Sequence, residues 1–367
     1  MNRILSQCTK ELAQFRRDRL TMALAFVLPV LTLLIFGFAI RLEAKNIPLL
    51  VQDFDNSPLS RSYIERLFAA NQFEPVSWTS RSAQAALDDG AAKAVVIIPP
   101  DFSRKIKARN PSAIQVLVDG TDVNNARVIR NSIQATTRFF LTTSGLQPHH
   151  PPITARTRIW FNPGRKESLY IVPGTCAVIW WIYPSLLSAL AMVREKEQGT
   201  IIQVYASSLR AGELILGKGL AYLLIGLGEA VVIILVSIFV FNLRLAGNPI
   251  PLLIGTPLFI MTAVLFGLLV GTRTGAQNAA VQVVAVVGFV SALLLSGFIY
   301  PLSNIPFPLS LLSNIIPARY FIVIIRDAFV RGTGWPSVWI PMLMLVILGF
   351  LLFNAARHNL SRMQMTS

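Results

Sequence analysis

The sequence has few charged residues for its length. Charged residues make up 14% of the 367 residues and hydrophobic residues 53%, and the mean hydropathy is +0.57. So small a charged fraction excludes an ordinary soluble protein and indicates a chain that crosses a membrane several times. The net charge of +15 does not indicate a nucleic-acid partner, because no basic run with interleaved aromatic residues accompanies it. A membrane surface explains the scattered Lys and Arg.

Cysteine and histidine are nearly absent. The two cysteines, Cys8 and Cys176, lie in a predicted helix and in an apolar run, so no disulfide framework is expected. His149 and His150 stand together among prolines, where a solvated loop is favoured over a metal site. The polar region around them, residues 41–169, contains no HExxH or GxSxG motif. We predict no catalytic residue and no metal site.

A phosphate-binding loop is also incomplete. Residues 212–219 match most of the pattern GxxxxGK[ST], but Gly219 stands where a hydroxyl is needed to hold Mg²⁺. No buried strand precedes this stretch, and it continues into an apolar run. We therefore predict that the chain binds no cofactor and has no nucleotide site of its own.

What the sequence does contain begins with a basic amphipathic segment and an apolar run. Residues 1–20 carry five Lys or Arg against two acids, with apolar residues at helical spacing, which predicts a helix in the headgroup plane. Residues 21–40 have no charge and can cross about 30 Å of hydrocarbon. A secretory signal is the alternative, but its apolar core is usually only about 7 to 15 residues long.

Residues 41–169 differ in character from the rest. They contain 17 Lys or Arg and 11 Asp or Glu, which is typical of a water-exposed domain. Alternating apolar residues predict strands at 47–52, 93–98, 114–118 and 153–160, and helical patterns predict helices at 57–70, 82–88 and 123–142. We expect an inserted α+β domain.

Residues 170–355 supply five further predicted spans. Apolar runs cover residues 168–193, 219–243, 245–272, 277–299 and 338–355. Prolines crowd residues 300–332 and disfavour a continuous helix there, so this part is predicted to be re-entrant or interfacial, with an amphipathic piece at 320–329. Residues 356–367 form a predicted tail. The fold class is thus a polytopic α-helical membrane protein with six transmembrane helices and an inserted α+β extracytoplasmic domain.

The orientation follows from the short loops. With six spans, the side that holds both termini carries twelve Lys or Arg in its short segments, and the opposite side carries four. Because the basic side faces the cytoplasm, both termini are predicted to be cytoplasmic and residues 41–169 to lie outside.

A charged segment, residues 194–218, separates the second and third spans and is predicted to form a cytoplasmic docking hairpin. Gly199 breaks the helix there, and an amphipathic piece at 200–209 follows. The residues expected to couple this hairpin to a partner are Arg194, Glu195, Glu197, Gly199, Thr200, Val204 and Leu209.

Glu229 lies near the middle of the third predicted span. A carboxylate at that depth costs at least about 2.5 kcal/mol unless it finds a partner or water. Two interpretations stay open: Glu229 lines a substrate path or a subunit interface, or it is a protonated acid that bonds a neighbouring helix. Gly267, Gly271 and Gly288 are expected to permit close helix packing.

Several stretches resemble a known family. The hairpin REKEQGT at 194–200, with SLRAGELILGK at 208–218, is similar to the hairpin of ABC type-2 transporter permeases. SGFIYP at 296–301 resembles the same family, and RIWFNP at 158–163 and VPG at 172–174 resemble its subgroup of exporter permeases that have a large loop after the first span. The resemblance covers essentially the whole chain; Ser208 departs from it, because the family often has proline there.

The resemblance implies a bacterial cytoplasmic (inner) membrane permease that dimerises with a second copy or a paralogue. Each subunit would dock on a separate ABC ATPase, which would bind ATP and Mg, through a coupling helix in the hairpin and an N-terminal connecting helix. Export of drugs, lipid-like or other amphiphilic molecules is expected, and such permeases commonly work with a periplasmic adaptor and an outer-membrane channel. A membrane-anchored ligand sensor or scaffold is the main alternative, and a polytopic membrane enzyme is another.

Overall fold

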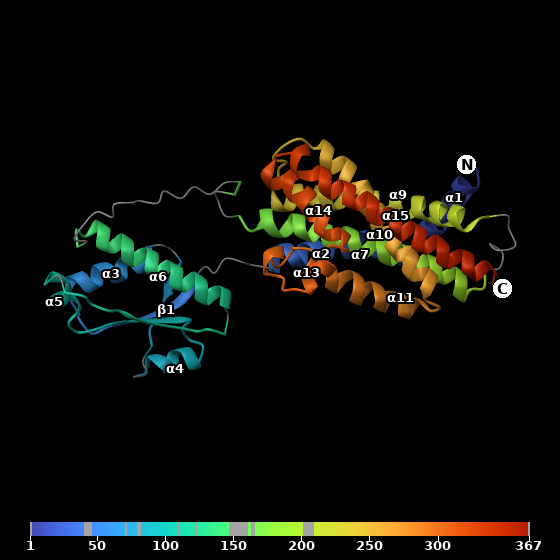
Figure 1. The fold of residues 1–367 in the computed structure, drawn as a ribbon. Helices are drawn as coiled ribbons and strands as arrows, with labels where there is room; N and C mark the ends of the chain where they lie inside the picture. Colours follow the sequence, from blue (N-terminus) through green and yellow to red (C-terminus); the bar gives the residue numbers. More distant parts are fainter. Residues whose placement is uncertain are drawn as a thin grey trace. The chain divides into compact units, whose positions relative to one another are not determined.

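The computed structural model describes residues 2–39, 46–69, 72–78, 82–108, 110–121, 123–146, 161–162, 166–200 and 209–365. The chain forms two compact units (Figure 1). The helical unit consists of Met1–Ile40 and Arg158–Ser367, and the inserted unit consists of Arg41–Thr157.

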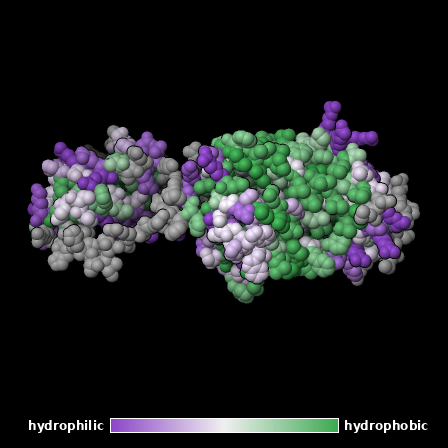
Figure 2. All heavy atoms as spheres, turned by 90° about the horizontal axis from the view of Figure 1, so that it is seen from above, coloured by the Kyte–Doolittle hydropathy of each residue, from purple (hydrophilic) through white to green (hydrophobic). Residues whose placement is uncertain are grey.

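The helical unit contains six helices that are long and apolar enough to cross a membrane, counted over the described residues. On the face drawn in Figure 2, hydrophobic side chains form a broad band across this unit, and hydrophilic side chains gather at its two ends. This pattern confirms a polytopic α-helical membrane protein. The candidate spans are α2 (Arg19–Ala39), α7 (Ser168–Glu197), α9 (Ala211–Phe241), α10 (Ile250–Arg273), Gln277–Leu295, and the Trp335–Ser361 part of α15 (Trp335–Met365).

Three of these helices extend beyond the apolar runs from which they were predicted. The second run was expected to end at residue 193, but α7 continues to Glu197, and α9 begins at Ala211 rather than 219. The connection between them therefore shortens from the predicted 194–218 to residues 198–210. The predicted tail at 356–367 is helical as far as Met365, because no Gly or Pro follows Gly349 in α15. Loss of hydrophobicity ends a span without ending the helix.

Close contact between α7 and α10 forms the centre of the helical unit. A methyl group on Gly267 would lie 2.0 Å from the carbonyl oxygen of Ser185, and one on Gly271 would lie 2.6 Å from the Cβ atom of Met192. The Ser188 hydroxyl donates to the carbonyl of Val264 at 3.0 Å. Gly267 and Gly271 thus permit close packing as predicted, whereas a methyl group at Gly288 would make only ordinary contacts, the nearest at 3.5 Å.

Between the fifth and sixth spans the chain packs against the helical core. The fifth span consists of α11 (Gln277–Val283), a π-helical turn and α12 (Ser291–Leu295), and the short helices α13 (Leu309–Ser313) and α14 (Pro317–Arg326) follow. Phe321 of α14 stacks on Phe259 with ring centroids 4.3 Å apart. Arg326 donates hydrogen bonds to the carbonyls of Gly297 and Phe298, at 3.0 and 3.2 Å. The depth of this segment in the membrane stays a prediction.

The inserted unit is built on a four-stranded mixed sheet of order β2-β1-β3-β4. Strand β1 (Ile47–Asp53) pairs in parallel with β2 (Phe73–Pro75) and with β3 (Ala94–Ile98), and β4 (Gln115–Val118) is antiparallel to β3. Two of its elements, β2 and the helix α5 (Phe102–Lys107), were not predicted, because three and six residues are too short for a periodic pattern. The strand predicted at 153–160 lies outside the described residues.

Helices cover both faces of this sheet. Helix α3 (Pro58–Ala69) and helix α6 (Val123–Thr143) lie on one face, and α4 (Ala83–Asp88) lies on the other (Figure 1). The larger core joins the first face to α3 and α6 through Tyr63, Leu67, Ile129 and Phe140. Whether this unit lies outside the cytoplasm stays a prediction.

Candidate functional site

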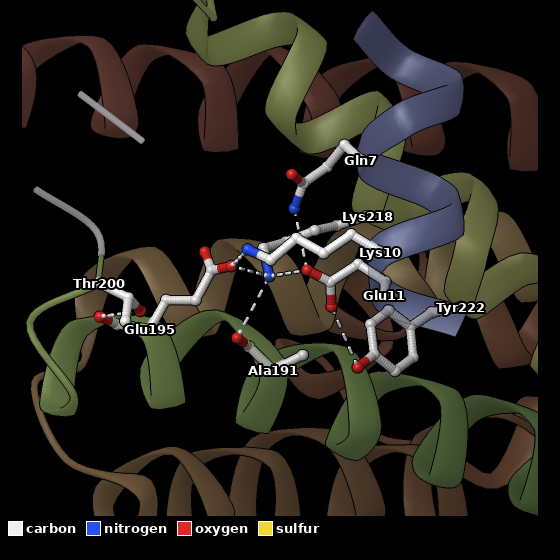
Figure 3. Close-up of polar contacts among 8 residues, drawn as sticks. All are labelled: Gln7, Lys10, Glu11, Ala191, Glu195, Thr200, Lys218 and Tyr222. Carbon is white, nitrogen blue, oxygen red and sulfur yellow. Dashed lines mark hydrogen bonds and ion pairs between the residues drawn. The ribbon is translucent and has the colours of Figure 1, made fainter. Parts of the chain in front are cut away.

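The candidate functional site is a cluster of charged side chains where three helices meet. Helix α1 (Asn2–Arg17) packs mainly on the first turns of α9, close to the last turns of α7, at the end of the helical unit that holds both chain termini (Figure 1). We call the four ionised residues at this contact, Lys10, Glu11, Glu195 and Lys218, the charged junction (Figure 3).

Lys218 is the centre of the charged junction. Its side chain is fully buried, and its Nζ atom lies 2.6 Å from a carboxylate oxygen of Glu11 and 3.2 Å from one of Glu195. It also donates to the carbonyl of Ala191 at 3.3 Å (Figure 3). A single lysine from α9 thus joins an acid of α1 to an acid of α7.

The two acids have further partners that complete the charge balance. Glu11 accepts hydrogen bonds from the Gln7 amide at 2.9 Å and from the Tyr222 hydroxyl at 3.5 Å (Figure 3). Glu195 accepts a second charged bond, from Lys10 at 2.8 Å. Two lysines therefore neutralise two glutamates, which is the condition under which buried charges are tolerated.

A second ion pair ties α7 to the corner between α1 and α2. Asp18 lies at this corner. Its carboxylate accepts hydrogen bonds from the Thr21 backbone amide at 3.1 Å and from the Thr21 hydroxyl at 2.6 Å, and so caps the start of α2. Arg194 approaches the same carboxylate at 3.0 Å. The Thr21 hydrogen bonds, with a smaller contribution from Arg194, hold the pKa of Asp18 below its usual value.

The last turn of α7 also holds the loop between α10 and α11. Lys196 donates to three carbonyl oxygens at the end of α10, those of Gly271, Thr272 and Thr274, at 2.7, 2.7 and 3.1 Å. Glu197 accepts the backbone amide of Gln277 at 2.8 Å, at the start of α11, and also binds that residue's side chain.

Residues 194–197 therefore each contact a different neighbour. They were expected to be loop charges at the water surface that face a partner protein, but they form the last turn of α7 and bind their own chain. Backbone bonds keep this turn helical, and the partners come from segments far apart in the sequence. The sequence alone could not identify these partners. One signal was present for Glu11, because its spacing from Gln7 and Cys8 places all three on the same, buried face of a helix.

The hairpin begins and ends with clear backbone signals. Gly199 has a φ of +69°, the left-handed conformation that ends a helix, and the Thr200 hydroxyl donates to the carbonyl of Glu195 at 3.2 Å. At the other end, the Glu213 side chain accepts the backbone amide of Arg210 at 2.9 Å and caps α9. The predicted amphipathic piece, with Val204, lies almost wholly in residues 201–208, outside the described residues.

A cavity of about 400 Å³ lies beside the charged junction. Its walls come from α1, α2, α7, α9 and the described ends of the hairpin, and they include Lys10, Arg194, Glu195, Thr200 and Leu209. Four of the predicted coupling residues, Arg194, Glu195, Thr200 and Leu209, thus line one cavity, whereas Glu197 points to the α10–α11 loop.

Glu229 lies about three turns further along α9 than Lys218. Its side chain is 1% exposed, and neither carboxylate oxygen has a hydrogen-bond partner among the described residues. The bonded-acid interpretation of Glu229 therefore finds no partner in the part of the chain that the structure describes.

Together, the six spans and a charged end built from α1, α7 and α9 define a multi-pass membrane protein with an organised polar terminus. The chain belongs to the ABC-2 family of transporter proteins, whose model matches residues 19–357. This confirms the family resemblance and makes the chain a permease of the ABC transporter class. Membership implies an ATPase partner and a second permease subunit.

Individual relatives agree with this assignment. The chain is 29% identical over 366 residues to the probable multidrug ABC transporter permease YbhS of Escherichia coli strain K12, covering 96% of this chain and 93% of that protein. It is 28% identical over 354 residues to the probable multidrug ABC transporter permease YbhR of the same strain, covering 94% and 95%. It is also 22% identical over 355 residues to ABC transporter G family member 20 of Dictyostelium discoideum, covering 94% of this chain and 48% of that protein.

Proposed function

We propose that this chain is the membrane-spanning subunit of an ATP-driven exporter, and that its charged junction passes motion between a separate ATPase and the spans. The observation that carries the proposal is the last turn of α7, where residues 194–197 bind α1, α9, α10 and α11. A displacement of the hairpin that follows this turn reaches four helices through direct polar contacts.

The residues nearest the hairpin have the coupling role in this proposal. Gly199 and Thr200 fix the exit from α7, and Leu209 precedes α9. We propose that the amphipathic piece predicted at 200–209, which includes Val204, docks on the ATPase as a short helix. Arg194, Glu195 and Glu197 connect that helix to the rest of the chain. ATP and Mg are bound by the ATPase.

We further infer that the exported molecules are drugs, lipid-like or other amphiphilic compounds. Support comes from the word multidrug in the names of the relatives YbhS and YbhR. The second permease subunit is another copy or a paralogue, and a periplasmic adaptor with an outer-membrane channel completes the export route. Glu229 is proposed to line the transport path or the subunit interface, because it is buried without a partner among the described residues.

In this proposal the protein lies in a bacterial inner membrane, with both termini in the cytoplasm and the inserted unit outside. Asn110 is exposed, and both native cysteines are buried, so a single new cysteine can report on each side. An impermeant maleimide should label Asn110→Cys in intact spheroplasts and should not label Ser367→Cys. The reverse labelling pattern would rule out this orientation.

The function itself is tested by purifying the chain with its ATPase and measuring ATP hydrolysis against a panel of amphiphiles. We expect an ATPase to co-purify and its hydrolysis to respond to substrate. Val204→Pro should leave the protein inserted but abolish transport, because proline in a short helix costs about 3 kcal/mol locally. Val204→Ala, which suits a helix, is the control. Normal transport by Val204→Pro would place the coupling surface elsewhere, and absence of any ATPase would favour a sensor or scaffold.

A further inference from the structure

A groove runs along helix α6 of the inserted unit, between that helix and the edge strand β4. Two cavities, of about 530 and 470 Å³, adjoin there and share Val116, Ile133 and Gln134 in their walls. Strand β4 ends the sheet, so no further strand of the described residues covers this side. The described residues therefore leave the side of the groove beyond β4 uncovered.

The floor of the groove is aliphatic. It includes Ile106, Ile114, Val116 and Val118, which are half-buried at the margin of the core below them. Apolar surface that stays in contact with water favours an apolar ligand, at about 25 cal/mol per Å² covered.

One wall of the groove is basic. Arg127, Arg130 and Arg138 line it, and together with Gln134 they follow one side of α6 at spacings of three and four residues. All three arginines are exposed, and α6 contains no acidic residue. Among the described residues no ion pair neutralises them.

Asp119, the acid that follows strand β4, already has partners of its own. Its carboxylate lies 2.7 Å from Lys93, and it also accepts hydrogen bonds from Thr121. The arginines therefore remain available for an anion from outside the chain, and their guanidinium groups match planar or tetrahedral oxyanions.

A polar atom inside the groove also lacks a partner. The Ser112 hydroxyl is buried in the wall of the 470 Å³ cavity and makes no hydrogen bond to any described residue. Thr137 in the same wall, in contrast, bonds the carbonyl of Ile133 at 2.7 Å and the Tyr63 hydroxyl at 2.8 Å. A buried hydroxyl without a partner indicates a place for a polar group of a ligand.

We propose that this groove binds an anionic amphiphile, with its carboxylate, sulfate or phosphate head on the arginines of α6 and its hydrocarbon chain on the aliphatic floor. This inference rests on the proposed exporter function and specifies its substrates. They are anionic lipid-like molecules, which the inserted unit binds. Cationic amphiphiles would be repelled by the same three arginines.

The test uses the full-length protein in nanodiscs of zwitterionic lipid, photolabelled with a diazirine derivative of palmitate and, separately, with the matched long-chain amine. Mass spectrometry then locates the label. We expect palmitate to label residues 112–118 and 126–141 at least about tenfold more than the amine does. In Arg127→Gln/Arg130→Gln/Arg138→Gln the palmitate label should fall to the amine level.

Two further variants control for folding and for net charge. Arg127→Lys/Arg130→Lys/Arg138→Lys keeps the charge and should keep most of the label. Arg61→Gln/Arg104→Gln/Lys107→Gln removes as many exposed charges of the inserted unit outside the groove and should label like the wild type.

Equal labelling by palmitate and amine, or palmitate labelling that survives the triple Gln substitution, overturns the proposal. It is also overturned if the groove stays unlabelled while a photocrosslinker at Gln134 captures a protein in cells, since the groove is then a protein interface. ATP-driven transport is measured separately with the ATPase bound. Transport without groove labelling rejects only this inference, and groove labelling without ATP-driven transport rejects only the exporter function.

Discussion

Helix α9 carries a buried lysine and a buried glutamate whose surroundings are opposite. Lys218, near the start of the helix, has two carboxylates within 3.2 Å, whereas neither oxygen of Glu229, in the middle, has a partner among the described residues. Burial alone therefore does not indicate what a charged residue does. A buried charge with partners fixes the helices that supply them, and a buried acid without partners points to a role outside the static fold.

The largest effect on stability should come from removing the buried lysine of the charged junction. Lys218→Met would leave Glu11 buried with no cation and Glu195 with only the half-exposed Lys10, so we expect a loss of about 3–5 kcal/mol in the free energy of unfolding. Thermal unfolding in detergent measures it. Arg273→Met, which removes an exposed cation at the end of α10, is the control and should change little. Equal unfolding temperatures for both variants would mean that the junction does not hold α1.

A second substitution should restore part of that loss. In Glu11→Gln/Lys218→Met the unpaired acid of α1 is neutral, and Glu195 keeps Lys10 at 2.8 Å. We expect the double variant to be more stable than Lys218→Met by about 1–3 kcal/mol, as for residues that interact directly. Simple additivity of the two single effects in the same unfolding assay would show that the two residues are not coupled.

Substitution in the middle of α9 should separate stability from function. Glu229→Gln breaks no hydrogen bond of the described residues, so the free energy of unfolding should change by less than about 1 kcal/mol. Transport, or the response of ATP hydrolysis to substrate, should change. Ser237→Ala, at another buried polar position of α9, is the control. Unchanged transport with normal expression would assign Glu229 a structural role.

The smallest effect is expected at the rim of the junction. The side chain of Lys10 is 42% exposed, and its pair with Glu195 is therefore screened by water. Lys10→Gln should cost only about 0.2–1 kcal/mol, and the difference from wild type should shrink as salt is added. A cost as large as that of Lys218→Met would mean that burial does not set the strength of these pairs.

The sequence was sufficient to predict features that depend on local composition. Each apolar run predicted one span, and periodic patterns predicted α3, α4 and α6 of the inserted unit to within about two residues. It was insufficient at the ends of α7 and α9, because the lysine that stabilises them pairs with an acid 207 positions away. Lys218 and residues 194–197 look like water-exposed loop charges until the helices that neutralise them are in place.

The most direct test of the account is substrate-stimulated ATP hydrolysis by the purified permease–ATPase complex carrying Glu195→Gln. This substitution removes the acid that links α7 to α1 and α9, while the pair of Lys218 and Glu11, at 2.6 Å, is left intact, so we expect the fold to be retained. If the charged junction transmits motion, the ATPase should still co-purify, and the stimulation by substrate should fall about tenfold. Glu65→Gln, at an exposed position of α3 in the inserted unit, should keep normal stimulation. Wild-type stimulation in the Glu195→Gln complex would contradict the account.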